Sequence, residues 1–267
     1  MKILALGLIA ATLWALPVRA QAPDAAASDD RWDTRVSAAK GDVVVHPADG
    51  GEEASAEADM PLDEGDRVTT GPDSYADISL DGDSLIHVGA NSDFTVEKTA
   101  KNESSFSLAL GSLMAKIQKL GSQRLLVRTP SAVAAVRGTE FGVEAESDQQ
   151  THVGVFDEGR VEVKGDAGTE TLAPNQETSV ARGRAPMKPI LLKRFARMRG
   201  FMKGHRQRLA ALRKRWKSLP PAQRRARRQQ VMRRMRRLRR EMRQNRQQMN
   251  KNQQRRQAIE ERRRRNK

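Results

Sequence analysis

The charge of this chain is divided unevenly along its length, and the division separates two parts with different folding potential. Residues 186–267 contain 32 Lys and Arg but only three acids, Glu241, Glu260 and Glu261. Since this segment carries +29 and the whole chain +16, the first 185 residues carry −13. The chain is therefore an acidic body joined to an arginine-dense tail. Such a tail usually indicates a nucleic-acid partner.

The first twenty residues have the features of an export signal, which argues against nucleic acid. Met1 and Lys2 form a short positive region, residues 3–16 are largely apolar, and Val18 and Ala20 place small residues before a cleavage site. The apolar run is shorter than the roughly 18–20 residues that span a bilayer. We predict a signal peptide over residues 1–20, cleaved after Ala20, and a periplasmic or secreted protein without an integral membrane span. An uncleaved N-terminal anchor is the alternative.

The mature chain must fold without disulfide bonds. It contains no cysteine, which excludes disulfides, cysteine-ligated zinc, a thiol nucleophile and a lipid-modified cysteine. Residues 21–30 are rich in Ala, Pro, Asp and Ser and have no periodicity, so we predict a disordered leader. Residues 31–183 are numerous enough to build one core.

Short apolar alternations separated by turn residues fill this central region. They predict an all-β sandwich or barrel, because strands recur about every 8–12 residues with no helical period between them. The predicted strands are residues 43–45, 67–70, 76–80, 85–88, 94–96, 106–110, 113–117, 125–128, 133–137, 141–145, 153–156, 161–163 and 177–180. In residues 76–80 the apolar side chains share one face, while Asp77 and Ser79 share the other, which should meet water.

Glycine-containing pairs mark the turns between these strands. Asp81-Gly82 and Glu158-Gly159 supply the positive φ of tight hairpins, and Gly71-Pro72-Asp73 is typical of a strand-to-strand corner.

After Gly183 the hydrophobic period becomes that of a helix, so residues 184–267 form a predicted Arg-rich helical region. A first heptad seam ends at Pro220-Pro221, and a second one loses its apolar character toward the C-terminus. These seams predict a helical hairpin or a coiled coil. The first comprises Leu191, Phe195, Met198, Met202, His205, Leu209, Leu212, Trp216 and Leu219; the second comprises Val231, Met235, Leu238, Met242, Asn245, Met249, Asn252, Arg256 and Ile259.

The segment from Thr129 to Val143, with its Thr-Pro, small β-branched strand and Arg-Gly-Thr-Glu-Phe-Gly-Val, resembles the signature of the FecR domain family. Five further stretches match in the expected order, among them Leu110 to Leu113, which resembles the family's glycine turn in the middle of the domain. The resemblance therefore covers about residues 36–182. It implies a jelly-roll-like β-sandwich, exported and without enzymatic activity. In the family's founding members this domain transmits a receptor's ligand status to a sigma factor, through a cytoplasmic segment and a transmembrane helix. The only hydrophobic segment here begins at residue 3, so the resemblance does not carry over the anti-sigma activity.

Most residues of the signature have a structural explanation in turns and core positions. Arg137 is the exception, because an arginine beside a glycine turn could pair with a buried acid or face a partner. The signature residues are Thr129, Pro130, Arg137, Gly138, Thr139, Phe141, Glu158 and Gly159.

No sequence motif points to catalysis. His46, His87, His152 and His205 are scattered, with no pair at metal-ligand spacing. Asp81-Gly82-Asp83 resembles the start of a calcium loop, but the twelfth position is Ser92 rather than Glu. We therefore predict no metal, no cofactor and no enzyme.

The tail is the strongest surface signal, because guanidinium groups bind phosphate bidentately. Its anionic partner could be lipid, lipopolysaccharide, a cell-wall polymer or the protein's own acidic domain. We predict a non-enzymatic envelope binding or sensing module, whose β-domain meets a protein or glycan partner and whose tail contacts anionic surfaces or self-associates. A structural oligomerising protein and a polyanion or nucleic-acid binder are the alternatives. The predicted anion-binding residues are Arg224, Arg225, Arg227, Arg228, Arg233, Arg234, Arg236, Arg237, Arg239 and Arg240.

Overall fold

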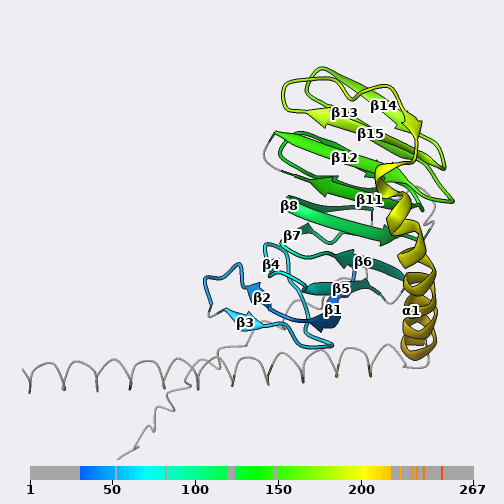
Figure 1. Ribbon diagram of the computed structural model, residues 1–267. Helices are drawn as coiled ribbons and strands as arrows, with labels where there is room; N and C mark the ends of the chain where they lie inside the picture. Colours follow the sequence, from blue (N-terminus) through cyan, green and yellow to red (C-terminus); the bar gives the residue numbers. More distant parts are fainter. Residues whose placement is uncertain are drawn as a thin grey trace, which may run out of the picture.

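The computed structural model describes residues 31–217, apart from 52, 82, 101, 119–123 and 147–148, together with six single positions farther along (223, 226, 230, 233, 237 and 248). The predicted signal peptide and leader lie outside the described residues. The described chain forms sixteen strands, followed by a 3-10 helix and one α-helix (Figure 1). No helix among the described residues is long and apolar enough to cross a membrane.

The strands form two sheets that share β8. Sheet I has the order β3-β2-β4-β7-β8-β9-β10-β13-β14, and sheet II the order β1-β5-β6-β8-β11-β12-β15-β16. Every pairing is antiparallel except that of β8 with β9. The strands are β1 (Thr34–Lys40), β2 (Val43–His46), β3 (Ala54–Ser55), β4 (Arg67–Thr70), β5 (Tyr75–Leu80), β6 (Ser84–Val88), β7 (Asp93–Lys98), β8 (Glu103–Lys116), β9 (Arg124–Arg128), β10 (Val133–Val136), β11 (Glu140–Ala145), β12 (Gln150–Val155), β13 (Val161–Gly165), β14 (Gly168–Leu172), β15 (Gln176–Ala181) and β16 (Ile190–Leu191).

Strand β8 joins the two sheets because it bends in its middle. Its first half pairs with β7 and β9 in sheet I, and its second half pairs with β6 and β11 in sheet II. Gly111 lies at the bend with φ +93°, and a Cβ there would lie 2.2 Å from the Ser92 hydroxyl oxygen. Only glycine fits this position. The sequence predicted two strands separated by a turn at Gly111; the structure has one strand that changes sheets.

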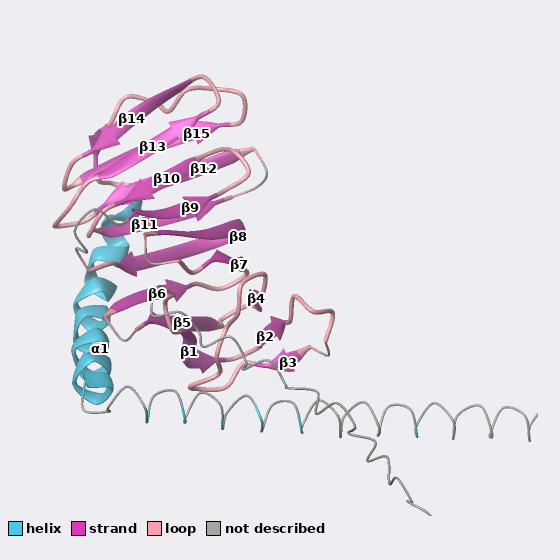
Figure 2. Ribbon diagram, turned by 180° about the vertical axis from the view of Figure 1, so that it is seen from behind, coloured by secondary structure: helices cyan, strands magenta, loops and turns pink. Residues whose placement is uncertain are grey.

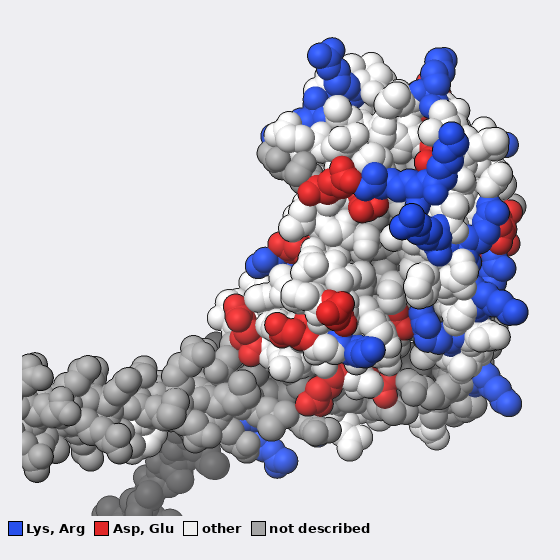
Figure 3. Space-filling model, viewed as in Figure 1, with Lys and Arg blue, Asp and Glu red and all other residues white. Residues whose placement is uncertain are grey.

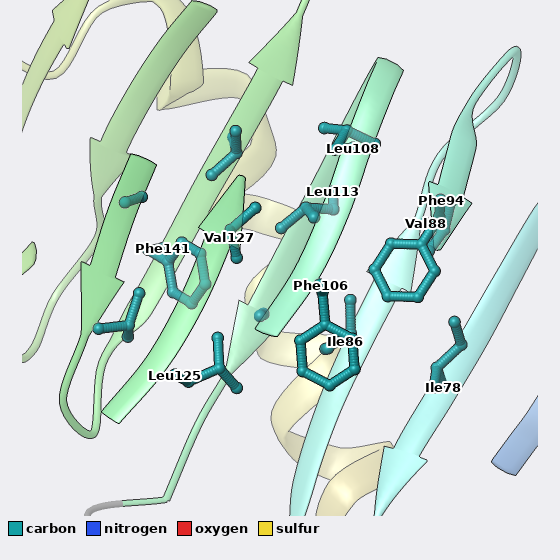
Figure 4. Packing of buried hydrophobic residues seen from close by; sticks show 14 of the residues in the cluster. Ile78, Ile86, Val88, Phe94, Phe106, Leu108, Leu113, Leu125, Val127 and Phe141 are labelled. Carbon is teal, nitrogen blue, oxygen red and sulfur yellow. The ribbon is translucent and has the colours of Figure 1, made fainter. Parts of the chain in front are cut away.

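A single hydrophobic core lies between the sheets and draws on both. The rings of Phe94 and Phe106 from sheet I stack with centroids 5.5 Å apart (Figure 4). Phe141, Val143 and Ala145 of β11 alternate into the same core, as predicted. Burial on this scale is the main stabilising contribution to the fold.

The all-β prediction is confirmed, whereas the jelly-roll topology is not. All thirteen predicted strands overlap strands of the structure, two of them the two halves of β8. Strands β1, β3, β14 and β16 were not predicted, because their apolar alternation is short or interrupted; β1, for example, has a bulge between Val36 and Ala38.

Two of the three predicted turns are as expected. Asp81 has φ +49° in the β5–β6 hairpin, and Asp73 has φ +54° at the corner between β4 and β5. Glu158-Gly159 does not close a hairpin. It lies in the connection from β12 in sheet II to β13 in sheet I, where Gly159 has φ +93°.

The helical region begins later than predicted. Residues 184–193 run extended along β15, where Met187 accepts a hydrogen bond from the Thr178 hydroxyl (2.6 Å) and donates its N–H to Ser179 (2.9 Å). The 3-10 helix η1 (Arg194–Met198) and α1 (Arg199–Lys217) follow. The seam residues from Phe195 to Leu209 pack on the protein's own sheet II, so this part of the first seam is not the core of a coiled coil. Leu191 is exposed, and the second seam lies entirely outside the described residues.

Replacing Phe141 with Ala should lower the free energy of unfolding by about 3–5 kcal/mol, because it leaves a cavity in a fully buried position. Urea denaturation of the full chain measures this. Phe201→Ala is the matched control, since Phe201 is 68% exposed and its loss should cost less than about 0.5 kcal/mol. Equal losses for the two variants would contradict the described core.

Candidate functional site

Helix α1 crosses the outer face of sheet II (Figure 1; Figure 2). We call the part of sheet II beneath the helical segment the covered face, and it is the candidate functional site. The segment from Arg194 onward meets β15 first, then β12 and β11, then β6, and finally β5. Lys and Arg side chains line the side of the molecule that α1 occupies (Figure 3). The basic segment thus lies against the acidic body.

The apolar part of this contact is built around Phe195. Its ring lies on Gly142 of β11 and Gly154 of β12, where an added Cβ would lie 2.8 Å and 2.6 Å from ring carbons. Phe156 meets the ring edge to face, with centroids 6.5 Å apart. With Met114, Leu192 and Met202 these rings form a small cluster separate from the main core. The two glycines provide the socket because any side chain there would displace the ring.

Sheet II also caps the start of η1. Lys193, at the N-cap position, makes no side-chain cap bond. The Glu177 carboxylate of β15 instead accepts the backbone N–H of Arg194 (2.9 Å) and of Phe195 (3.4 Å). A carboxylate at a helix N-terminus satisfies free N–H groups and interacts favourably with the helix dipole. Glu177 thus fixes where the helical segment begins.

Glu140 is the most deeply buried charge beneath α1. Its side chain is 0% exposed and accepts hydrogen bonds from Lys116 Nζ of β8 (2.6 Å) and Arg206 Nε of α1 (2.6 Å). Burial alone would raise the pKa of Glu140, but the hydrogen bonds from Arg206 and Lys116 lower it overall. The carboxylate is therefore ionised and links the helix to the sheet.

Further ion pairs surround this centre. Arg206 also bonds Asp157 (2.6 Å), and Arg199 lies 3.4 Å from the same carboxylate. Arg194 bonds Glu144 (2.8 Å) and also pairs with Glu146. The hydrogen bond to Glu144, followed by that to Glu146, raises the pKa of Arg194 above its ordinary value.

A second buried group lies farther along α1. Asp77 of β5, with its side chain 2% exposed, pairs with Arg208 Nε (3.0 Å) and with His87 Nδ1 (2.7 Å). His205 is fully buried beside them, and its Nε2 lies 3.1 Å from the carbonyl oxygen of Leu85. The sequence placed Asp77 and Ser79 on a water-facing side; both are buried, and α1 is what covers Asp77.

Residues 66–162 match the family model described as FecR protein. The chain contains a FecR domain. Asp77, Glu140 and the glycine socket all lie within these matched residues, whereas Glu177 and α1 lie beyond them.

The comparison with solved structures gave two crystal structures of a candidate anti-sigma factor from Parabacteroides distasonis. Both are 18% identical with a TM-score of 0.44, over 49% of this chain and 62% of that one. The chain therefore spans less than two thirds of that protein's length. No curated protein matches the chain.

The FecR signature residues hold the two sheets together. Thr139 is buried, and its hydroxyl donates to the Arg160 carbonyl and accepts the Arg160 N–H, each at 3.1 Å. A Cβ on Gly159 would lie 2.3 Å from this hydroxyl oxygen. The Arg-Gly-Thr and Glu-Gly motifs of the FecR domain are thus two sides of one contact, at which both chain segments cross between sheets.

The remaining signature residues have separate positions. Gly138 has φ +61°, and Phe141 is in the core. The Thr129 hydroxyl lies 2.7 Å from that of Thr151 in sheet II, next to Pro130. Glu158 pairs with Lys116 (2.7 Å). Arg137 is exposed and makes no ion pair with a described residue, so of the two roles considered for it, pairing with a buried acid is absent among the described residues.

Most of the predicted anion-binding arginines lie outside the described residues. Arg233 and Arg237 are described, and both are helical and exposed. The sheet residues of the covered face were not identified from the sequence, although the seam residues that pack on it, Phe195, Met202, His205 and Leu209, were. The described residues contain no group of three or more His, Cys, Asp or Glu that could hold a metal ion.

Gly154→Ala should push Phe195 out of its socket and loosen α1 while leaving the main core intact. Overpacking of this kind costs about 1–3 kcal/mol, so trypsin cleavage at Arg199, Arg206 and Arg208 should accelerate about tenfold. Gly200→Ala is the matched control, because nothing lies within 4 Å of its Cβ position. Equal cleavage rates for the wild type and Gly154→Ala would contradict the socket.

Glu140→Gln should lower the free energy of unfolding by about 2–3 kcal/mol at pH 7, since two cations lose their buried partner but both reach solvent. Because the pKa of Glu140 is held below its ordinary value of 4.5, its contribution is present above about pH 4.5 and decreases as the pH falls further. Denaturation between pH 3 and 7 should therefore show a flatter acid limb for this variant. Glu144→Gln, at a partly exposed carboxylate, should cost under about 1 kcal/mol; similar losses for both would refute the assignment.

Proposed function

We propose that this protein is a non-enzymatic binding module of the cell envelope, in which the FecR domain holds an arginine-rich tail and presents it to an anionic surface. The observation that carries this proposal is the one-sided docking of α1. The apolar seam and four arginines of η1 and α1 face sheet II, whereas Arg197 of η1 and Lys203 and Lys214 of α1 are exposed. The docked helix leads directly into residues 218–267, which contain 20 Lys and Arg and three acids.

The contact of η1 and α1 with sheet II identifies a partner for the first part of the tail. Arg194, Arg199, Arg206 and Arg208 pair with acids of the β-domain, so the first part of the tail has an internal partner. Residues 218–267 add 20 Lys and Arg against only three acids. An external polyanion is therefore the partner we propose for residues 218–267, with the phosphates of anionic lipids as its chemistry.

The export signal predicted over residues 1–20 supports an envelope location, and the FecR domain supports a sensing role rather than catalysis. Self-association through the first seam is disfavoured, because Phe195, Met202, His205 and Leu209 are buried against the same chain. The β-domain's own partner belongs to the same proposal: a protein or glycan of the envelope that meets the exposed part of the FecR domain.

The test is vesicle binding by the full chain after Gln replaces the ten arginines from Arg224 to Arg240 that are named above. Each basic residue near an anionic surface contributes about 1 kcal/mol, so affinity for phosphatidylglycerol vesicles should fall by at least about 100-fold. The same ten positions replaced with Lys are the matched control and should bind within about tenfold of the wild type. Vesicles of phosphatidylcholine alone should bind none of the three.

Unchanged vesicle binding by the Gln variant would overturn the proposed function. A wild-type preference for duplex DNA over the vesicles, with a steep loss of affinity as salt rises, would instead favour the nucleic-acid alternative.

A further inference from the structure

His205 is the only fully buried polar side chain that α1 contributes among the described residues. Its Nε2 lies 3.1 Å from the Leu85 carbonyl oxygen of β6, and its Nδ1 lies 3.3 Å from Nη2 of Arg208. A carbonyl only accepts, so Nε2 must carry the hydrogen; a guanidinium only donates, so Nδ1 must be free to accept. Both contacts therefore require the neutral imidazole.

The charges around His205 leave no place for another cation. Arg208 and Arg206 flank it on α1, His87 of β6 meets its ring edge on at 6.1 Å, and Asp77 of β5 is the nearby acid. Both carboxylate oxygens of Asp77 are already engaged, one by His87 and one by Arg208. Tyr75 of β5 packs on the far side of His87. Burial, together with Arg208 and His87, lowers the pKa of His205 despite the opposing effects of Leu85 and Asp77.

If α1 leaves sheet II, each buried carboxylate beneath it still has a hydrogen-bonding partner from the sheet. Asp77 keeps His87 as a partner from the sheet, and Glu140 keeps Lys116. The apolar cluster under α1 is separate from the main core between the sheets. Release of α1 would therefore cost the small cluster and the helix's ion pairs, while the core stays in place and each buried acid keeps one partner from the sheet.

We propose that His205 makes the docking of α1 a pH-dependent latch: the helix is held on sheet II while the imidazole is neutral and is released when Nδ1 takes a proton. A proton there would place a donor against the Arg208 donor and a second positive charge beside the Arg208 guanidinium. The released state then binds the extra proton, so docking is strongest above about pH 6.5, the ordinary pKa of histidine. Below that pH the equilibrium constant for docking of α1 on sheet II should fall by up to about tenfold per pH unit, until the pH reaches the lowered pKa of His205 in the docked state.

Hydrogen exchange followed by mass spectrometry on the full chain tests the latch at pH 7.5 and pH 5.0, after correction for intrinsic exchange. Protection in peptides of residues 199–212 should fall by up to about 30-fold at the lower pH, while peptides of β11 and β12 keep theirs. His205→Gln is the matched variant, because its amide N–H can replace Nε2–H toward Leu85 but does not titrate. This variant should remain docked at both pH values.

Three results would overturn the proposal. The first is unchanged protection of residues 199–212 in the wild type. The second is an equal loss in His205→Gln, which would assign the response to another titratable group under α1, His87 included. The third is a parallel loss in β11 and β12, which would indicate global unfolding.

His205→Lys carries a permanent cation and should lose protection of α1 already at pH 7.5. Its retention of wild-type protection would also contradict the latch, even if His205→Gln were to dock poorly. None of these readouts involves vesicles, so the latch and the proposed tail function can fail separately.

Discussion

The arrangement of the described chain beyond the β-core depends on one constraint: carboxylates on the outer face of sheet II are removed from water and must each face a cation. Asp77 and Glu140 are almost completely buried, and a buried carboxylate without partners would be prohibitively costly. Each has one partner from the sheet, His87 or Lys116, and one arginine from the helical segment. These shared partners set the position of α1 along the strands, and the Phe195 socket adds the apolar contact.

The β-core was largely readable from the sequence because its pattern is local. Alternation in β11 or β5 reports directly which side chains share a face, and Asp81 and Gly159 need positive φ in the structure as expected. What the pattern could not give is which strands meet. The bend of β8 at Gly111 looks in sequence like a turn between two strands, because both need a glycine with positive φ. Pairing on both sides of the bend decides between them, and that is a property of distant segments.

The covered face was hidden for a related reason. Asp77 and Ser79 alternate with core residues, which is typical of a solvated face, and the Leu85 carbonyl that meets His205 lies 120 residues earlier in the chain. Glu140 stands inside the FecR signature, where turn and core roles explained its neighbours. The seam from Phe195 to Leu209 was visible, but a stripe of apolar residues does not specify what covers it. Gly142 of β11 and Gly154 of β12 are paired neighbours without side chains. They were the available signal that the apolar seam packs on a sheet rather than on another helix.

The same contact connects the two charged parts of the molecule. The acidic body neutralises the first arginines of the tail and orients the rest, so the charge division seen in the sequence is partly an internal interaction. The most direct test is an NMR measurement of nuclear Overhauser effects between the Phe195 ring protons and the α-protons of Gly142 and Gly154 in the full chain at neutral pH. The account predicts strong cross-peaks to both glycines, whose α-protons should also be shifted by the ring current. Absence of these cross-peaks, with the sandwich otherwise folded, would contradict the docking of α1 on sheet II.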